Sequence, residues 1–226
     1  MEITMKFNYQ QAIESIYTDA RWEAYYDPVI IPFFNICCYN TGVKIVPVHA
    51  TRKSGRKPLL SKKHFIDTYS IVKRKIRDGK EVEIRYGIPD YVIVPIDSTY
   101  DNPKKSLLNI EFKLPEDLTG EYKEINPIKY KTELQYQFEY CANIILTDGV
   151  TWYFLKNADE INTAKPITLY DHTNKCWKKS HKIICLDCEK ALYDDQETDQ
   201  CAPNELDELL ETIKSMIEKA IKNNHA

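Results

Sequence analysis

The sequence predicts an α/β fold in which helices flank a central sheet. Short runs rich in β-branched and aromatic residues, bounded by Gly, Pro, Asn and Asp, alternate with segments whose apolar residues recur at helical spacing. Of the 226 residues 43% are hydrophobic, which is enough to bury a core without disulfide or metal staples. We expect a single domain over residues 1–226, with a core at about 8–156 and a C-terminal extension at 157–226.

The first predicted element is a helix over residues 9–26. Ala12, Ile16 and Ala20 recur every four residues and fall along one side of this segment. The second element is a strand at residues 42–48, which is rich in valine and isoleucine. The sequence therefore predicts a helix and then a strand as the first two elements.

A loop punctuated by Gly and Pro follows at residues 54–58. Ser61 is a suitable N-cap for a helix over residues 61–75. The apolar residues that would face the core from this helix are Phe65, Tyr69, Val72 and Ile76. We expect Asp78-Gly79 to end the helix.

The central sheet is expected from apolar, β-branched runs in the middle of the chain. Residues 82–86 and 88–96 predict its first hairpin, and residues 108–114 predict the next strand. Residues 144–155 contain two apolar runs around a Thr-Asp-Gly turn, which is typical of a second hairpin. Short apolar runs within 157–202 indicate added strands.

The chain ends in an amphipathic helix that Pro203 opens. Its apolar stripe predicts either a helix docked on the body of the protein or a dimer seam. The stripe consists of Leu206, Leu209, Leu210, Ile213, Ile217 and Ile221.

Two acidic motifs in the predicted sheet carry the functional signal: Pro89-Asp90 and Glu111-Phe112-Lys113. Side chains two apart on a strand share a face, so Glu111 and Lys113 project together. Carboxylate oxygens suit hard cations such as Mg²⁺, which polarise a phosphoryl group and activate water. Asp90 and Glu111 are therefore candidate metal ligands, Lys113 is a candidate for holding the attacking water, and the backbone carbonyl of Phe112 is a candidate further ligand.

The order of these motifs resembles the PD-(D/E)XK nuclease superfamily, and more narrowly the nuclease domain at the N-terminus of type I restriction R subunits. The resemblance covers roughly residues 85–156. It includes the polar-aromatic segment 134–140 and the hairpin at 144–155, in which Asp148 stands where the family usually has asparagine. It implies a restriction endonuclease-like core, a central mixed β-sheet flanked by helices, and phosphodiester hydrolysis with Mg²⁺ or Mn²⁺.

The resemblance also implies further site residues. In such folds the helix after the third strand carries a glutamine that contacts the phosphate or the water network, which corresponds here to Gln135 or Gln137. The first helix often donates a glutamate to the metal site, and Glu23 is the first candidate, with Glu14 the second. The alternative for both glutamates is an ordinary surface position.

Basic residues gather in one region although the formal net charge of the chain is −3. Residues 52–80 contain eleven basic and two acidic residues, a local net charge of +9. Such a block can neutralise phosphates, and the alternative is a solvated surface. The candidate nucleic-acid contacts in the loop and at the start of the following helix are Arg52, Lys53, Arg56, Lys57, Lys62 and Lys63.

The seven cysteines are expected to be reduced, because their number is odd and the N-terminus lacks the apolar core of a signal peptide. Cys185 and Cys188 form a C-x-x-C pair, flanked by Cys176 and Cys201, which is half of a zinc or iron–sulfur site. Some RecB-like nucleases hold such a cluster with an upstream cysteine, for which Cys37 or Cys38 is available. The prediction is ordinary thiols, with a metal site as the alternative.

We expect a cytoplasmic, metal-dependent DNA endonuclease of restriction or phage defence. The longest apolar run, residues 29–38, is too short to span a membrane. No phosphate-binding Gly-rich loop is present, so the protein would act alone, as a homodimer, or with a motor subunit. RNA as substrate and exonuclease action stay open. The competing hypothesis is a catalytically silent nuclease-fold protein that binds nucleic acid or a protein partner.

Overall fold

A computed structural model of the protein describes residues 6–17, 26–48, 60–115, 122–178, 183–185, 190–192 and 205–224. Its centre is a six-stranded mixed sheet with the strand order β2-β5-β6-β7-β8-β9. β6 and β7 are parallel, and the other neighbouring strands are antiparallel. The strands are β2 (Val43–Pro47), β5 (Tyr91–Pro95), β6 (Leu108–Phe112), β7 (Ile144–Thr147), β8 (Thr151–Leu155) and β9 (Ile167–Thr168).

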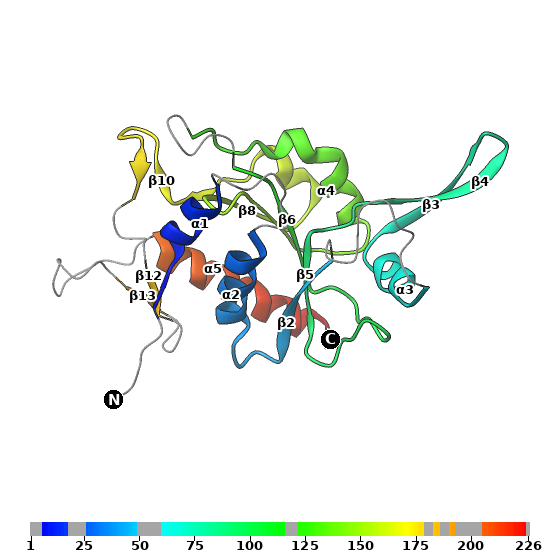
Figure 1. The fold of residues 1–226 in the computed structure, drawn as a ribbon, viewed down its shortest axis with the longest axis horizontal. Coiled ribbons are helices and arrows are strands. Elements are labelled where there is room, and N and C mark those ends of the chain that lie inside the picture. Colours follow the sequence, from blue (N-terminus) through cyan, green and yellow to red (C-terminus); the bar gives the residue numbers. More distant parts are fainter. Residues whose placement is uncertain are drawn as a thin grey trace.

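Helices cover both faces of this sheet (Figure 1). One face packs against α1 (Tyr9–Tyr17), α2 (Asp27–Cys38) and α5 (Glu205–Asn224) in the largest apolar cluster. The other face packs against α3 (Leu60–Thr68) and α4 (Lys131–Phe138) in two smaller clusters. Because both faces are covered, β6 and β7 are buried along their whole length.

The crossover between the parallel strands β6 and β7 determines where α4 lies. Parallel neighbours cannot be joined by a tight turn, so the chain leaves the sheet and returns through η3 (Pro127–Tyr130) and α4. Leu134 of α4 is fully buried against the sheet and anchors the helix there. The polar residues of α4 are thereby brought over the centre of the sheet.

Several predicted elements are confirmed. The strand predicted at 42–48 is β2, the strand at 108–114 is β6, and the hairpin at 144–155 is formed by β7 and β8. The C-terminal stripe is docked on the body of the protein, because Leu206, Leu209, Leu210, Ile213 and Ile217 are buried in the main cluster.

The prediction of a helix over residues 61–75 is wrong beyond residue 68. α3 ends at Thr68, and the chain then forms the antiparallel pair β3 (Ile71–Arg77) and β4 (Lys80–Tyr86). Asp78 and Gly79 do not end a helix but form the two-residue turn of this hairpin, with φ values of 51° and 73°. Such a turn requires positive φ at both positions, which Asp-Gly tolerates. Val72 and Ile76 are exposed rather than in a core.

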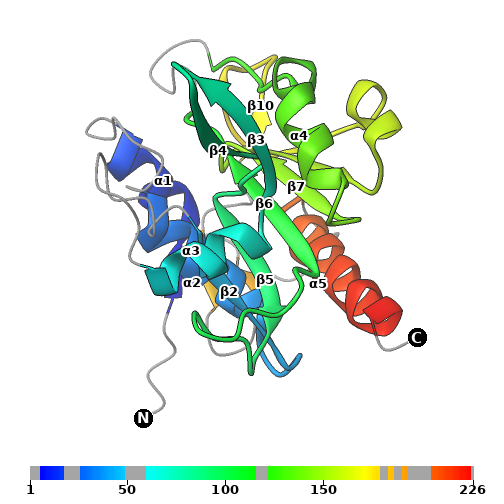
Figure 2. The same cartoon turned by 90° about the vertical axis from the view of Figure 1, so that its right-hand side faces the viewer.

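The predicted hairpin of residues 82–86 and 88–96 is also wrong. Of the strands that the structure describes, β4 pairs with β3, whereas β5 pairs with β2 and β6. The chain turns between β4 and β5 at Gly87, whose φ is +63°. The β3–β4 hairpin consequently lies outside the central sheet and projects from the body of the protein (Figures 1 and 2).

The remaining described elements are short. β1 (Lys6–Asn8), β12 (Ile183–Cys185) and β13 (Lys190–Leu192) form a three-stranded sheet, and β10 (Tyr170–Asp171) pairs with β11 (Cys176–Trp177). The 3-10 helix η4 (Ala158–Asn162) follows β8, and the strands β9 to β13 are the added strands expected after residue 157. The predicted helix at 9–26 begins as α1, and residues 18–25 lie outside the described residues. None of the described helices is long and apolar enough to cross a membrane.

Candidate functional site

The register of β5 and β6 places Asp90 opposite Glu111. Tyr91, the first residue of β5, pairs with Ile110, so Asp90 just before the strand faces Glu111 of β6. The backbone N–H of Asp90 donates to the carbonyl of Ile110 at 3.1 Å, and its Oδ2 accepts a bond from the N–H of Phe112 at 2.9 Å. Both acids are buried, with 6% and 2% of their surface exposed. The two motifs meet at the end of one strand pair.

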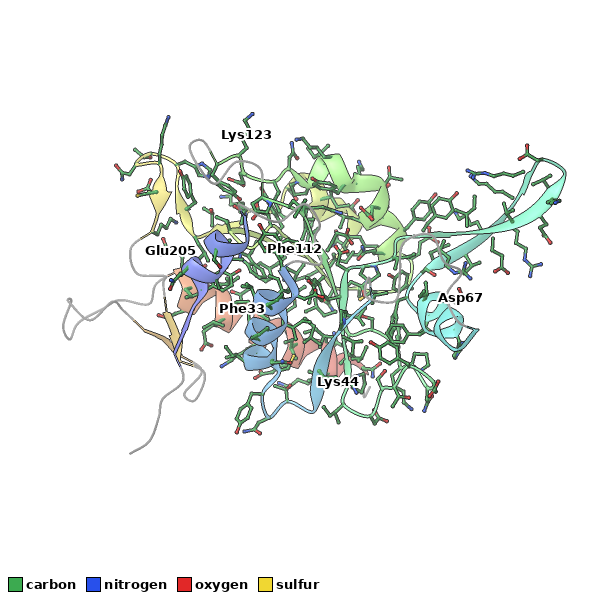
Figure 3. All side chains as sticks on the ribbon, viewed as in Figure 1. Phe33, Lys44, Asp67, Phe112, Lys123 and Glu205 are labelled. Carbon is green, nitrogen blue, oxygen red and sulfur yellow. The ribbon has the colours of Figure 1, made fainter. Side chains whose placement is uncertain are left out.

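Residues of β6 alternate between two environments. Ile110 and Phe112 point into the main apolar cluster, where the ring of Phe112 lies 4.9 Å from that of Tyr26, in the interior of the molecule (Figure 3). Asn109 and Glu111 point to the other face, toward α4. The two-residue period of a strand thus puts the polar side chains together and leaves Phe112 in the core.

The carboxylate of Glu111 is held by two side chains. Its Oε1 accepts a bond from Lys113 Nζ at 2.5 Å, and its Oε2 accepts one from Gln137 Nε2 at 2.7 Å. Lys113 also donates to Glu133 Oε2 at 3.3 Å, and its ammonium lies 4.9 Å from the centre of the Tyr130 ring. Lys113 therefore joins the strand to α4 and η3.

The charges of the site act on one another. Burial raises the pKa of Glu111, and the neighbouring Asp90 carboxylate raises it further, while Lys113 partly offsets both effects. Burial lowers the pKa of Lys113, but Glu111 and Glu133 outweigh burial, so the net shift is upward. Lys113 therefore stays cationic at neutral pH and cannot serve as a general base there. Its ammonium faces three carboxyl groups.

A buried polar network fixes the orientation of Gln137. Its Oε1 accepts a bond from Asn109 Nδ2 at 3.1 Å, and Asn109 also bonds the hydroxyl of Tyr140 at 3.0 Å. The Tyr140 hydroxyl donates to the carbonyl of Gly87 at 2.6 Å. A Cβ at Gly87 would lie 2.6 Å from that of Tyr136, so only glycine permits α4 to approach this closely.

An open pocket of about 430 Å³ adjoins the site. Tyr130 and Glu133, the two neighbours of Lys113 on the η3–α4 segment, form one side of it. The base of the β3–β4 hairpin forms the other side, through Arg85 and Tyr86. The pocket therefore lies between the two neighbours of Lys113 and the base of the projecting hairpin.

The structure separates the two candidate glutamines. Gln137 is fully buried and bonds Glu111, whereas Gln135 is exposed on the opposite side of α4. Residues three and four apart on a helix share a face, and Leu134, three residues before Gln137, faces the sheet. That relation places Gln137, and not Gln135, over Glu111.

Other predicted site residues are not placed. Glu23 and the four loop residues Arg52, Lys53, Arg56 and Lys57 lie outside the described residues. Glu14 belongs to α1, and Lys62 and Lys63 belong to α3, but the structure does not describe their side chains.

The cysteines divide in a similar way. Cys188 and Cys201 lie outside the described residues, and the backbone of Cys185 belongs to β12. Cys176 is exposed, whereas Cys37 and Cys38 are buried in α2. Burial raises the pKa of Cys38 to about 12, which keeps this thiol protonated and unreactive.

Sequence reasoning missed Asn109, Glu133 and Tyr140. Asn109 precedes Glu111 by two residues, so the period of a strand places both on one face. Glu133 precedes Gln137 by four residues, so the period of a helix does the same. Tyr140 follows the end of α4 and is brought to Asn109 by tertiary packing alone. The first two were predictable from spacing.

The donor set fits a hard divalent cation whose other ligands are water molecules or substrate oxygens. Asp90 and Glu111 supply carboxylate oxygens, and a cation between them would relieve their repulsion. Among the described residues no group of three or more His, Cys, Asp and Glu is placed to hold a metal. Mg²⁺ commonly binds through one or two carboxylates together with waters and substrate phosphates, so two suffice.

A third buried carboxylate, Asp148, occupies the turn between β7 and β8. Its Oδ1 accepts bonds from the N–H groups of Val150 at 2.9 Å and Thr151 at 2.8 Å, and its Oδ2 accepts one from the Tyr122 hydroxyl at 2.5 Å. Burial raises the pKa of Asp148 to about 6, and these hydrogen bonds limit the rise. Asp148 therefore stabilises the turn with neutral partners.

Comparison of the chain with models of known protein families, with curated proteins and with solved structures found no significant match. The resemblance to the nuclease superfamily therefore stays a prediction from the sequence motifs.

Proposed function

We propose that the protein is a metal-dependent nuclease of the restriction endonuclease-like fold and that it hydrolyses phosphodiester bonds of DNA. The observation that carries the proposal is the position of Asp90 opposite Glu111, with Lys113 bonded to Glu111 from the same strand. Two carboxylates and a lysine at the end of neighbouring strands supply metal ligands and a cation at one point. Restriction or phage defence is the biological setting that the resemblance suggests.

Asp90 and Glu111 would hold Mg²⁺ or Mn²⁺, with the Phe112 carbonyl as a further oxygen ligand. Such an ion polarises the phosphoryl group and lowers the pKa of a bound water. Asp90 is aligned for this role because the N–H of Phe112 fixes one of its oxygens. Gln137 fixes one oxygen of Glu111 in the same way.

Lys113 would position the attacking water or a phosphate oxygen. An ammonium has three N–H donors, of which Glu111 and Glu133 take two. The third donor is available to a substrate oxygen, and the raised pKa keeps the charge in place. Lys113 therefore acts through electrostatic stabilisation and orientation rather than by accepting a proton.

The test is incubation of the purified protein with supercoiled, linear and single-stranded DNA in Mg²⁺, Mn²⁺ or EDTA. We expect cleavage with a divalent ion and none in EDTA. Asp90→Asn and Lys113→Met should each lower the rate by roughly a hundredfold or more. Lys156→Met is the matched control, because Lys156 is an exposed lysine next to β8. Undiminished cleavage by both site variants would contradict the proposal.

The alternative is a catalytically silent protein of the same fold that binds nucleic acid or a protein partner. It is favoured by one observation: both oxygens of Glu111 already accept hydrogen bonds from protein side chains. Titration with Mn²⁺, followed by calorimetry, separates the two functions. Mn²⁺ binding that Asp90→Asn abolishes favours the nuclease, whereas DNA binding with neither Mn²⁺ binding nor cleavage favours the silent protein.

A further inference from the structure

The β3–β4 hairpin is a two-stranded ribbon with solvent on both of its faces. All residues of β3 from Val72 to Arg77 are exposed, and among the described strands β4 pairs with β3 alone. The ribbon projects from the body of the protein beyond α3 and α4 (Figure 1). Burial of apolar surface therefore does not explain the composition of its outer part.

The register of the ribbon sorts its charges by face. Directly opposed residues of an antiparallel pair point to the same side. One side carries the pairs Lys73–Ile84, Lys75–Val82 and Arg77–Lys80, with four cations and no acid among them. We call this side the basic face. The other side carries the pairs Val72–Arg85, Arg74–Glu83 and Ile76–Glu81, with two cations and two acids. We call it the balanced face.

Ion pairs occupy the balanced face. Arg74 lies 3.9 Å from Glu81, and Arg85 contacts both Glu83 and Asp67, an acid of α3 at the base of the ribbon (Figure 3). In the part of the chain that the structure describes, none of the four cations of the basic face forms such a pair. The positive charge of the ribbon is thus uncompensated on one side only.

The basic face leads to the candidate site. The ammonium of Lys73 lies 4.6 Å from the ring centre of Tyr136 on α4, and the ammonium of Lys75 lies 5.6 Å from that of Tyr86. Both rings line the pocket that Glu133 also lines. A polyanion on the basic face would therefore run toward Lys113 and the carboxylates.

We propose that the basic face of the β3–β4 ribbon binds the phosphate backbone of duplex DNA and guides it to the pocket beside Glu111 and Lys113. Charge complementarity selects this occupant, because regularly spaced Lys and Arg side chains match a polyanion. Seven residues of a strand span about 23 Å, and a two-stranded ribbon fits the major groove of DNA. Lysine contacts to phosphates position a duplex without reading its sequence, so binding should be sequence-independent.

The test compares two neighbouring exposed positions on opposite faces. Lys75→Glu and Arg74→Glu change the charge by the same amount on the same strand, so a general loss of positive charge affects both alike. Binding to a fluorescent duplex is measured by anisotropy in EDTA at several salt concentrations. Lys75→Glu should lower the affinity for every sequence, and Arg74→Glu should leave it close to that of the unmodified protein.

A triple variant on the basic face measures the number of contacts. Lys75→Gln, Arg77→Gln and Lys80→Gln together should reduce the slope of log affinity against log salt by about 0.9 per lost contact, or about 2.7 in total. Circular dichroism and the melting temperature check that the fold is retained. Equal losses from both faces, or an unchanged slope in the triple variant, would overturn the proposal. The proposal would also be overturned if the triple variant lost binding to phosphatidylserine-containing vesicles but kept its DNA binding.

This inference deepens the proposed function, and the assays separate their failures. Binding is measured without metal, so it does not depend on catalysis. One outcome is that DNA binding is lost only in the basic-face variants while the unmodified protein does not cleave DNA with any metal tested. That outcome would contradict the nuclease function and support the ribbon as a DNA-binding surface. If Asp90→Asn abolishes cleavage but the triple variant still cleaves DNA at moderate salt, the nuclease function is supported and DNA binding by the ribbon is contradicted.

Discussion

Glu111 on β6 and Asp148 in the β7–β8 turn are both buried carboxylates, but they are stabilised in different ways. Glu111 has charged neighbours, namely Lys113, Asp90 and Glu133. Asp148 has neutral donors, two backbone N–H groups and the hydroxyl of Tyr122. Burial raises the pKa of both acids. Burial therefore destabilises the charged form of both acids, and different neighbouring groups offset this cost.

That difference separates a candidate functional acid from a structural one. Two of the donors to Asp148 are backbone N–H groups at the β7–β8 turn, so they cannot rearrange without breaking this hairpin. The ammonium of Lys113 contacts Glu133, which lines an open pocket, so its charge can be shared with a substrate or displaced from Glu111 by a cation. A site that binds ions needs this exchangeable form of compensation.

Removal of Lys113 should have the largest effect on stability. Lys113→Met leaves Glu111 buried without its cation, which costs about 3–5 kcal/mol. The raised pKa of Glu111 means that its protonated form fits the folded state better, so the loss should be larger at pH 8 than at pH 5. Urea unfolding at the two pH values measures this. Equal losses at both would show that Lys113 acts through packing alone.

Asp148→Asn should stabilise the protein at high pH. An aspartate whose folded pKa is raised from 3.8 to about 6 contributes its full stability below pH 3.8 and loses it as pH rises through 6. The shift of about two units corresponds to about 3 kcal/mol at pH 8. Asparagine keeps an acceptor for the turn without the charge. Melting temperatures of the variant should rise at pH 8 and stay nearly unchanged at pH 4. A fall at pH 8 would mean that the turn needs the carboxylate.

Gln137 and Gln135 form a matched pair on one helix. Gln137→Leu removes the donor to Glu111 and the acceptor for Asn109, both of which are buried, at a cost of about 2 kcal/mol. Gln135→Leu alters an exposed position and should change the free energy of unfolding by less than about 0.5 kcal/mol. Denaturant titration compares them. Similar values for the two variants would remove Gln137 from the support of Glu111.

Among the variants of buried polar residues, Tyr122→Phe should lower the free energy of unfolding least. Tyr122→Phe removes one of three donors to Asp148, which costs about 1.5 kcal/mol because a bond to a charged acceptor is lost. The two backbone donors remain, so the turn should persist. The loss should shrink below the pKa of Asp148. In the Asp148→Asn background Tyr122→Phe should cost less, and an unchanged cost would show that the two groups are not coupled.

Sequence reasoning succeeded where one element decides the outcome. The period of a strand sufficed to place Glu111 beside Lys113, and the stripe of the last helix sufficed to predict its docking. It failed between the end of α3 at Thr68 and Arg77, where apolar residues four apart fit a helix but the chain forms β3. Asp78-Gly79, followed by Val82, Ile84 and Tyr86 in alternation, was the stronger signal for a hairpin.

The alternating faces of β6, the hairpin around Asp148 and the uneven distribution of basic residues follow from the order of the residues alone. Three other features do not: Asp90 lies opposite Glu111, Gln137 rather than Gln135 supports that acid, and the cations of β3 gather on one face of a ribbon. Periodicity cannot predict them, because it is a property of one strand or helix. The register between strands and the rotation of a helix depend on packing between segments far apart in the chain.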